Sequence, residues 1–266
     1  TGGDELFAGY GRYFRLPVEA RYLTLPAWLR QGLVEPVIGA CWPMTAWRLR
    51  RAGKFDGDPG GYLSEHATHF PPPMLKLMDS NLAPVRPAQG IHAAAFDGPR
   101  QSAALYADLN TYLVDDLLTL LDRTSMAVGV EGRVPFLDHR LVAAALAVPP
   151  EIRTPGGRQK ALEREMAAPF LPDEVIRAPK QGFASPVPAW LAAGLAEPAR
   201  RILTRPSTLE RGWWSEAGIA RLLARPATHG FRIYSLLMLE LAIRLFVEAP
   251  AGRPPSGGLE ALAHVA

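Results

Sequence analysis

The opening stretch of the chain, TGGDELFAGYGRY, places two glycines directly before two carboxylates, at Gly2, Gly3, Asp4 and Glu5. Glycine has no Cβ, so a backbone with two glycines in a row can approach a bulky anion closely. Carboxylate oxygens are hard ligands, of the kind that bind the Mg²⁺ ion that accompanies phosphates. The pattern therefore indicates a phosphate site with Asp4 as a metal ligand. The alternative is a solvated turn that caps a helix beginning near Glu5.

Lysine is rare in this sequence, since only Lys54, Lys76, Lys160 and Lys180 occur among 29 basic residues. Arginine occupies the other basic positions. A broad guanidinium cannot replace a compact ammonium at a phosphate oxygen in a tight site. Lys180 and Lys160 are therefore candidates for phosphate contact. The alternative is that they are surface lysines that composition drift has left in place.

Charged residues are dense in LLDRTSMAVGVEGRVPFLD, residues 120–138. Buried charges need partners, so Asp122, Arg133 and Asp138 fit an ion-pair network that locks a helix to the following loop. Glu131 lies on a tight segment between a valine and a glycine, and a functional role is favoured for it. A structural role is therefore an open alternative for Asp122, Arg133 and Asp138, whereas Glu131 is a candidate functional residue.

Composition limits the class of protein. The chain has 266 residues, 48% of them hydrophobic, which is enough for one large core or two small ones. Its 29 basic and 26 acidic residues are spread along the chain and leave a net charge of only +3, which argues against nucleic acid as a partner. The most apolar segment, residues 231–247, carries three charges and is expected to be a buried helix rather than a membrane span.

The single cysteine, Cys41, excludes a disulfide within the chain. Nothing in the sequence points to export or to an oxidising compartment, so a cytoplasmic location is expected. Cys41 is expected to be a small buried hydrophobic residue.

The periodicity of apolar residues predicts a mostly helical chain. Leucines recur every four positions from Leu105 to Leu121 and predict an amphipathic helix over 104–121, with Asp108, Asp115 and Asp116 away from the apolar face. Asp138 is expected to cap a helix that prolines end at 149–150, and the remaining helices are expected near 159–168, 188–203, 215–224 and 231–247. Strand signals are nearly absent, and residues 128–136 are interpreted as a loop.

Four segments occur in the order GGDELFAGYGRY, LLDRTSMAVGVEGRVPFLDHRLV, KALEREM and APKQGF. Together they resemble the synthetase domain of glutamine-dependent, class B asparagine synthetases. The resemblance covers most of the chain from Gly2 to about Ile243. It implies that aspartate is activated by ATP as β-aspartyl-AMP and is aminated with glutamine-derived ammonia to give asparagine.

The resemblance also implies a domain organisation. Residues 1–248 would be the mostly α C-terminal part of an α/β nucleotide-binding domain of the adenine nucleotide α hydrolase (PP-loop) type, and residues 249–266 a flexible tail. In that family a glutaminase domain and a pyrophosphate loop of the form SGGxDS come before the GGDE segment. Neither is present in these 266 residues. We therefore expect a C-terminal fragment of a longer protein, inactive by itself.

Roles on the phosphate side follow from the same resemblance. Asp4 would be the Mg²⁺ ligand beside the pyrophosphate, Glu5 a supporting carboxylate, and the Gly2–Gly3 backbone a close contact for ATP. Lys180 would stabilise negative charge at the α-phosphate and at the later tetrahedral intermediate. Lys160 would contact ATP phosphates. The implied cofactors are ATP and Mg²⁺.

On the acceptor side, Glu131 resembles a carboxylate that binds or orients the nucleophile, and Arg123 would hold the acidic substrate. Asp122 and Arg133 would support substrate binding unless they serve only as ion pairs. One departure matters here: many relatives carry an acid where this chain has Thr1, and that acid is thought to assist the ammonia step. The identity of the acceptor is therefore open.

Alternatives remain within and outside the enzyme class. A specialised amidotransferase acting on an envelope polysaccharide, a β-lactam or a lasso peptide would share these motifs and differ in its acceptor pocket. A helical interaction module that has lost catalysis is the alternative from another class. No membrane partner is expected, and a homodimer is left open.

Overall fold

The structure is a computed structural model that describes residues 1–55, 57–83, 88–182 and 185–248. Every regular element in this part of the chain is helical, which agrees with the predicted mostly α character. The chain divides into two compact units, Thr1–Thr68 with Val85–Gly182, and His69–Pro84 with Phe183–Ala266. The sheet predicted for the complete nucleotide-binding domain stays a prediction, and the tail predicted at 249–266 lies outside the described residues.

The α-helices of unit 1 are α1 (Gly3–Leu6), α2 (Pro17–Leu23), α3 (Ala27–Leu29), α4 (Glu35–Cys41), α5 (Pro43–Ala52), α6 (Pro59–Ala67), α8 (Ala88–Ala95), α9 (Arg100–Leu109), α10 (Thr119–Met126), α11 (His139–Ala147), α12 (Pro150–Arg153), α13 (Ala161–Ala167) and α14 (Asp173–Arg177). Its shorter or wider helical turns are η1 (Gly11–Tyr13), η2 (Arg30–Val34), η3 (Leu113–Leu118), η4 (Pro135–Leu137) and η5 (Pro155–Gly157).

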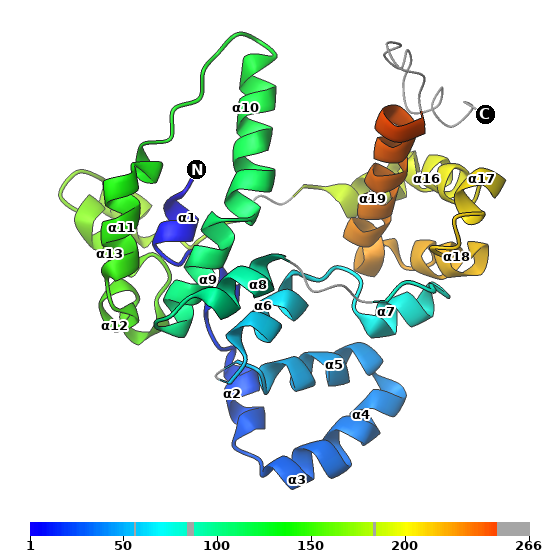
Figure 1. Cartoon of the computed structure of the whole chain (residues 1–266), viewed down its shortest axis with the longest axis horizontal. Helices are drawn as coiled ribbons and strands as arrows, with labels where there is room; N and C mark the ends of the chain where they lie inside the picture. Colours follow the sequence, from blue (N-terminus) through cyan, green and yellow to red (C-terminus); the bar gives the residue numbers. More distant parts are fainter. Residues whose placement is uncertain (56, 84–87, 183–184, 249–266) are drawn as a thin grey trace. The chain divides into compact units, whose positions relative to one another are not determined.

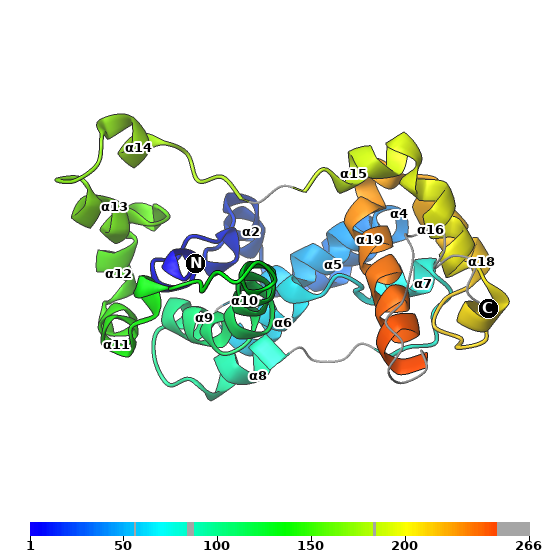
Figure 2. The same ribbon diagram turned by 90° about the horizontal axis from the view of Figure 1, so that it is seen from above.

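Unit 2 contains α7 (Pro72–Leu77), α15 (Val187–Trp190), α16 (Ala196–Leu203), α17 (Pro206–Leu209), α18 (Glu216–Leu223) and α19 (Pro226–Ala242), with π-helical turns at η6 (Leu191–Leu195) and η7 (Ile243–Glu248). The long helix α19 packs against α15, α16 and α18 (Figure 2). The helices predicted near 188–203, 215–224 and 231–247 are confirmed, the first with a kink at Gly194.

Helix α9 lies at the centre of unit 1 and contacts α1, α6, α8 and α11. Its residue Leu105 packs in one apolar cluster with Tyr13 and Tyr62. A second cluster joins α1 to α11 through Leu6, Phe7 and the small side chain of Ala145. The short N-terminal helix α1 is therefore fixed by helices far along the chain.

The prediction of one unbroken helix over 104–121 is wrong. Helix α9 ends at Leu109, and the chain turns before it continues as η3 and α10. The Asn110 amide donates to the Tyr106 carbonyl and the Thr111 hydroxyl to the Ala107 carbonyl. Such side chain to backbone bonds compete with the helical ladder and end the helix.

The placement of Asp108 on a polar face is also wrong, because its side chain is only 1% exposed. Arg12 and Tyr13 supply the partners that make this burial tolerable: the Arg12 Nη2 lies 2.7 Å from Asp108 Oδ2, and the Tyr13 hydroxyl donates to the same oxygen. Periodicity alone does not reveal that a distant segment brings an arginine.

The helix predicted after Asp138 is confirmed as α11, with the Asp138 carboxylate accepting from the Arg140 N–H as its cap. The helix predicted near 159–168 is confirmed as α13. Residues 128–134 form a loop as expected, and 135–136 begin the short turn η4. Cys41 contradicts its prediction: it is exposed rather than buried.

Arg153 is a fully buried guanidinium in unit 1. Its Nη2 donates to the carbonyls of Ala145, Leu146 and Val148 at the end of α11, and Nη1 donates to the Gln101 amide oxygen on α9. Burial lowers the pKa of Arg153. The guanidinium replaces water for carbonyls that a helix end leaves without intrahelical partners.

We predict that Arg153→Met lowers the free energy of unfolding by about 3 kcal/mol, because several buried carbonyls lose their donor. Urea unfolding followed by circular dichroism measures the change. Arg140→Met is the matched control, since the Arg140 side chain is 81% exposed and should contribute little. Equal losses in the two variants would contradict the structural role of Arg153.

His66 on α6 is expected to make the stability of unit 1 sensitive to acid. Burial, together with the positive charges of Arg51 and Arg12, lowers the pKa of His66 to about 4 from its ordinary 6.5. The unfolded chain therefore binds a proton at this site more readily than the folded chain between these pH values. The free energy of unfolding is therefore highest above pH 6.5, where His66 is neutral in both states. It falls by up to about 3 kcal/mol as the pH drops towards 4, because protonation of His66 favours the unfolded chain. His66→Gln should flatten the pH dependence of urea unfolding over this range, and an unchanged slope would refute the assignment.

Candidate anion-binding site

Asp4 on α1 is the meeting point of two lysines that are distant in sequence. Its Oδ2 lies 2.9 Å from Lys180 Nζ, and its Oδ1 lies 3.1 Å from Lys160 Nζ. All three side chains are about one-fifth exposed, at 20% for Asp4 and 22% for each lysine. The structure thus brings together the carboxylate and the two ammonium groups that the sequence predicted for phosphate contact.

Glycines near Asp4 allow the backbone to approach neighbouring side chains more closely than a residue with a Cβ could. Gly2 has a φ of +98°, which disfavours other residues, and a Cβ there would lie 2.7 Å from Leu137 Cδ2. A Cβ on Gly3 would lie 2.9 Å from Glu163 Oε1. Gly9 is a further requirement that the sequence analysis missed, since its Cβ would lie 1.8 Å from Asp4 Oδ1. The glycine spacing in GGDELFAGYG was the available signal.

Lys160 is held by its backbone as well as by its charge. It has a φ of +55° just before α13, and its N–H donates to the Phe7 carbonyl. The Gln159 amide donates to the Gly9 carbonyl and fixes the same segment. Burial lowers the pKa of Lys160, but the carboxylates of Glu163 and Asp4 outweigh this effect and raise it. Lys160 therefore stays a cation at neutral pH.

Lys180 follows α14 in a loop and is aimed at Asp4 by two contacts. Its Nζ donates to the Gln181 carbonyl at 3.1 Å and lies 5.6 Å from the centre of the Tyr10 ring. The Tyr10 hydroxyl donates to Glu5 Oε1 at 2.7 Å, and Glu5 is 1% exposed. Burial and the bond to Glu5 hold the pKa of Tyr10 well above its ordinary value, so it remains a donor. Glu5 thus supports the site indirectly, through its hydrogen bond with Tyr10.

Arg12 packs against the Tyr10 ring. Its guanidinium lies 4.3 Å from the centre of the Tyr10 ring and 5.0 Å from that of Tyr112. It is paired with the buried carboxylate of Asp108. Tyr10, Arg12, Tyr112 and Asp108 thus form a packed group next to Lys180, in which the charge of Arg12 is neutralised by Asp108. The sequence analysis missed Tyr10 and Arg12 as supporting residues.

The residues predicted on the acceptor side lie elsewhere in unit 1. Asp122 and Arg123 are exposed on α10, and Glu131 and Arg133 form an exposed ion pair in the loop that follows. The distance from Arg133 Nε to Glu131 Oε1 is 2.9 Å. The structure does not join these four residues to Asp4, and their roles stay predictions.

The donor set suits a phosphate better than a metal by itself. The described residues contain no group of three or more His, Cys, Asp or Glu side chains placed to hold a metal ion. Asp4 Oδ1 is nevertheless buried and accepts no hydrogen bond of good geometry, although Lys160 lies close to it. Mg²⁺ in nucleotide enzymes is commonly held by one or two carboxylates and the substrate phosphates. Asp4 fits that mode of binding.

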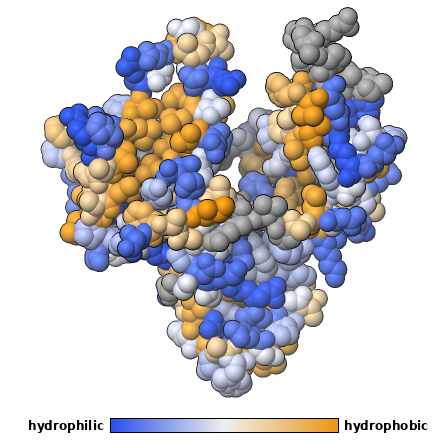
Figure 3. Space-filling model, in the orientation of Figure 1, coloured by the Kyte–Doolittle hydropathy of each residue, from blue (hydrophilic) through white to orange (hydrophobic). Residues whose placement is uncertain are grey.

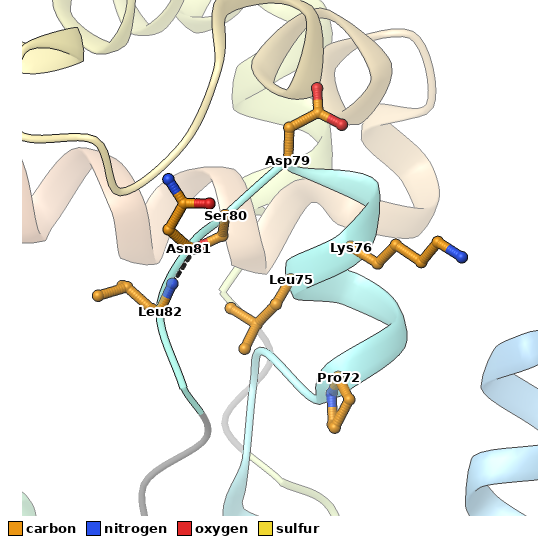
Figure 4. A pocket seen from close by; sticks show the side chains of 7 residues that line it. All are labelled: Pro72, Leu75, Lys76, Asp79, Ser80, Asn81 and Leu82. Atoms are coloured by element: carbon orange, nitrogen blue, oxygen red, sulfur yellow. Dashed lines mark hydrogen bonds between the residues drawn. The ribbon is translucent and has the colours of Figure 1, made fainter.

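A separate surface cavity in unit 2 is lined by residues of α7 and the segment after it (Figure 4). Lys76 is among the residues that line it, and Asp79 pairs with Arg221 and accepts a hydrogen bond from Ser215. The described lining residues do not form a recognisable catalytic group there.

Among the described helices, none has the length and apolar character needed to cross a membrane.

A family model described as "Asparagine synthase" matches residues 1–244. The chain belongs to the asparagine synthase family. This confirms the resemblance drawn from the GGDE and Lys180 segments, and it places Asp4, Lys160 and Lys180 of the present site all within the region shared with the family.

The chain is similar to several proteins named glutamine-hydrolysing asparagine synthetases. It is 28% identical to one from Bacillus subtilis over 221 residues, which are 78% of this chain and 33% of the relative. It is 28% identical to a putative one from Mycobacterium bovis over 259 residues, 93% of this chain and 39% of the relative. The human protein is 45% identical over 75 residues, 27% of this chain and 13% of the relative. The chain therefore spans between about a third and two-fifths of the length of these first two relatives. No solved structure matches it.

We predict that Asp4→Asn speeds acylation of Lys160 by acetic anhydride at alkaline pH. One of the carboxylates that raise the pKa of Lys160 is lost, so a larger fraction of its amine is neutral and reactive. Peptide mass spectrometry resolves the rates easily, because the chain has only four lysines. Exposed Lys76, in the other unit, is the internal control and should not change. An unchanged Lys160 rate would show that Asp4 does not act on it.

Proposed function

We propose that the chain is the C-terminal part of an ATP-dependent ligase that forms an amide, with glutamine-derived ammonia as nitrogen source and aspartate as the favoured acceptor. The observation that carries the proposal is the convergence of Lys160 and Lys180 on Asp4. Membership of the asparagine synthase family and the names of the relatives support it. The product would be asparagine.

Within this proposal, Asp4 is a counterion that a nucleotide replaces. Asp4 forms an ion pair with each of the two ammonium groups within the chain itself, and Glu163 also pairs with Lys160. Phosphate oxygens of ATP would take over these ammonium groups, and Asp4 would then be free to hold Mg²⁺. A bound Mg²⁺ ion supplies charge neutralisation on the departing pyrophosphate.

The lysines would act by fixed charge rather than by proton transfer. Lys180 would stabilise the negative charge that develops at the α-phosphate as the acceptor carboxylate attacks, because its Nζ is already held in place by Asp4 and Tyr10. Lys160 would bind the phosphates further from the reacting bond. The packed group that contains Tyr10 and Arg12 would keep both lysines aimed at the anion.

The acceptor site would be completed by the nucleotide-binding part of a longer protein. Figure 3 shows apolar side chains gathered over α1, α10 and the loop between α10 and α11. On α10 and this loop, Leu120, Met126, Val128 and Val130 are each more than half exposed. A contiguous apolar patch marks an interaction surface. We infer that a sheet packs here, so that Asp122, Arg123 and Glu131 come to line a closed site.

A specialised amidotransferase is the second candidate, favoured by Thr1 in place of the usual acid. Both candidates use ATP in the same way and differ in the acceptor. Pyrophosphate release by the intact enzyme separates them: release that depends on aspartate supports asparagine formation. Release that requires another carboxylate supports the alternative.

We predict that Lys180→Ala in the intact enzyme lowers kcat far more than it raises KM for ATP, because a contact made chiefly in the transition state is lost. The cost should be about 3 kcal/mol, roughly a hundredfold in rate. Lys180→Arg should rescue poorly, since a guanidinium lacks the compact geometry of the ammonium. Pyrophosphate release, corrected for folded fraction by circular dichroism, measures both variants.

A structural lysine would behave differently. Both variants would then lower the melting temperature while activity per folded molecule stayed near wild type. Lys76→Ala serves as the matched lysine control, because Lys76 is exposed in the other unit. Full turnover in Lys180→Arg would exclude the proposed role.

A further inference from the structure

The helical segment from α3 through η2 to α4 carries two exposed tryptophans at its ends. Trp28 is 74% exposed and Trp42 is 64% exposed. Between them, Leu33 is 56% exposed and Val37, four residues further along the same helix face, is 59% exposed. We call the surface formed by these four side chains the α4 surface. In unit 1, α5 packs against α4 on another side, where Gly39 lies (Figure 1).

The segment is apolar on nearly all sides. Its only charged residues are Arg30 and Glu35, and both are engaged inside the chain. The Tyr22 hydroxyl donates to Glu35, and Arg30 donates to the Leu25 carbonyl. A helix that is hydrophobic all round is normally buried in a protein core or in lipid. The α4 surface is therefore expected to be covered when the protein is in its working environment.

Arginines border the α4 surface on the neighbouring helices. From Leu16, which precedes α2, to Gly53, which follows α5, the chain has five arginines and two glutamates. One of these glutamates is Glu35, and the other, Glu19, is buried. Arg21 on α2 and Arg48 and Arg50 on α5 are exposed. Every exposed charge in this stretch is therefore positive.

The α4 surface has few groups that could specify a folded protein partner. Gln31 is the only exposed amide, hydroxyl or charged side chain in residues 27–42, all of which the structure describes. A specific protein interface usually carries several directed hydrogen bonds. An anionic lipid surface needs only apolar area and nearby positive charge. The charge and the composition of this region favour the lipid surface.

We propose that the α4 surface docks this protein onto a membrane that contains anionic phospholipids. Leu33 and Val37 enter the boundary between the headgroups and the acyl chains. Trp28 and Trp42 lie at the level of the headgroups, where the amphipathic indole ring is enriched. The exposed arginines of α2 and α5 attract the lipid phosphates.

The docked helix lies along the membrane and does not cross it. The segment covers residues 27–41, a length of about 22 Å at the rise of an α-helix. The hydrocarbon core of a bilayer is about 30 Å thick, so the segment is too short to span it. The expectation of no membrane partner concerns a span, whereas a helix in the plane of the surface needs none.

Cosedimentation of the 266-residue chain with lipid vesicles tests the proposal. The wild type should bind vesicles of mixed phosphatidylglycerol and phosphatidylcholine, and should bind pure phosphatidylcholine about tenfold more weakly. Added salt should weaken binding to the mixed vesicles. Phospholipids brominated on the acyl chain should quench tryptophan emission, because Trp28 and Trp42 lie close to the lipid.

Two double variants separate the apolar and the electrostatic contributions. Trp28→Ser with Trp42→Ser should bind mixed vesicles about tenfold more weakly and lose the quenching. Arg48→Gln with Arg50→Gln should keep the quenching at high lipid concentration and lose most of the preference for phosphatidylglycerol. All four side chains are exposed, so circular dichroism and the melting temperature should match those of the wild type.

The matched control is Trp190→Ser, since Trp190 is 46% exposed and belongs to the other unit. It should bind vesicles as the wild type does. Val128→Glu is a second control, because Val128 is 75% exposed in the apolar patch after α10. It should also leave vesicle binding unchanged.

Three outcomes overturn the proposal. A wild type that binds neither kind of vesicle would mean that a protein surface, or nothing, covers the α4 surface. Vesicle binding that survives loss of both Trp28 and Trp42 would use another surface, and its loss in Val128→Glu would locate that surface at α10. Equal binding to neutral and anionic vesicles would exclude the role of the arginines.

Discussion

The carboxylate of Asp4 is the contact on which the arrangement of unit 1 depends most. It draws together α1, the segment before α13 and the loop after α14 through two ammonium groups. Without it, Lys160 would keep only its ion pair with Glu163 and Lys180 would lose its ion pair, so two partly buried ammonium groups would be less well compensated. The same electrostatic need makes the site suited to an anion, because phosphate oxygens satisfy the lysines as a carboxylate does.

The layers behind Asp4 keep this balance in place. Tyr10 lies close to both Lys180 and Arg12, and Asp108 neutralises Arg12 in the core. Breaking one member of a buried pair leaves an uncompensated charge, which is strongly destabilising. The fold and the candidate site are therefore stabilised by one continuous set of polar contacts.

Much of the helical structure could be predicted from local pattern. Asp138 and the following prolines bound α11 as expected, because capping and helix termination are local effects. The break after Leu109 was missed because it depends on Asn110 and Thr111 bonding back to the preceding turn. Cys41 was wrongly expected in the core, since residue type alone does not tell which side of α4 is covered by α5.

The sequence by itself predicted the chemistry of the site. Two glycines before Asp4, together with the resemblance of the Lys160 and Lys180 segments to a known family, predicted these three residues as partners of a phosphate, and that role stays a prediction. Only the tertiary structure decided that both lysines meet one carboxylate, that Glu5 accepts from Tyr10, and that Asp122, Arg123, Glu131 and Arg133 are exposed on α10 and the loop after it. The physical reason is distance along the chain: helix periodicity and capping act within a few residues, whereas a contact between Asp4 and Lys180 exists only after the intervening helices have packed.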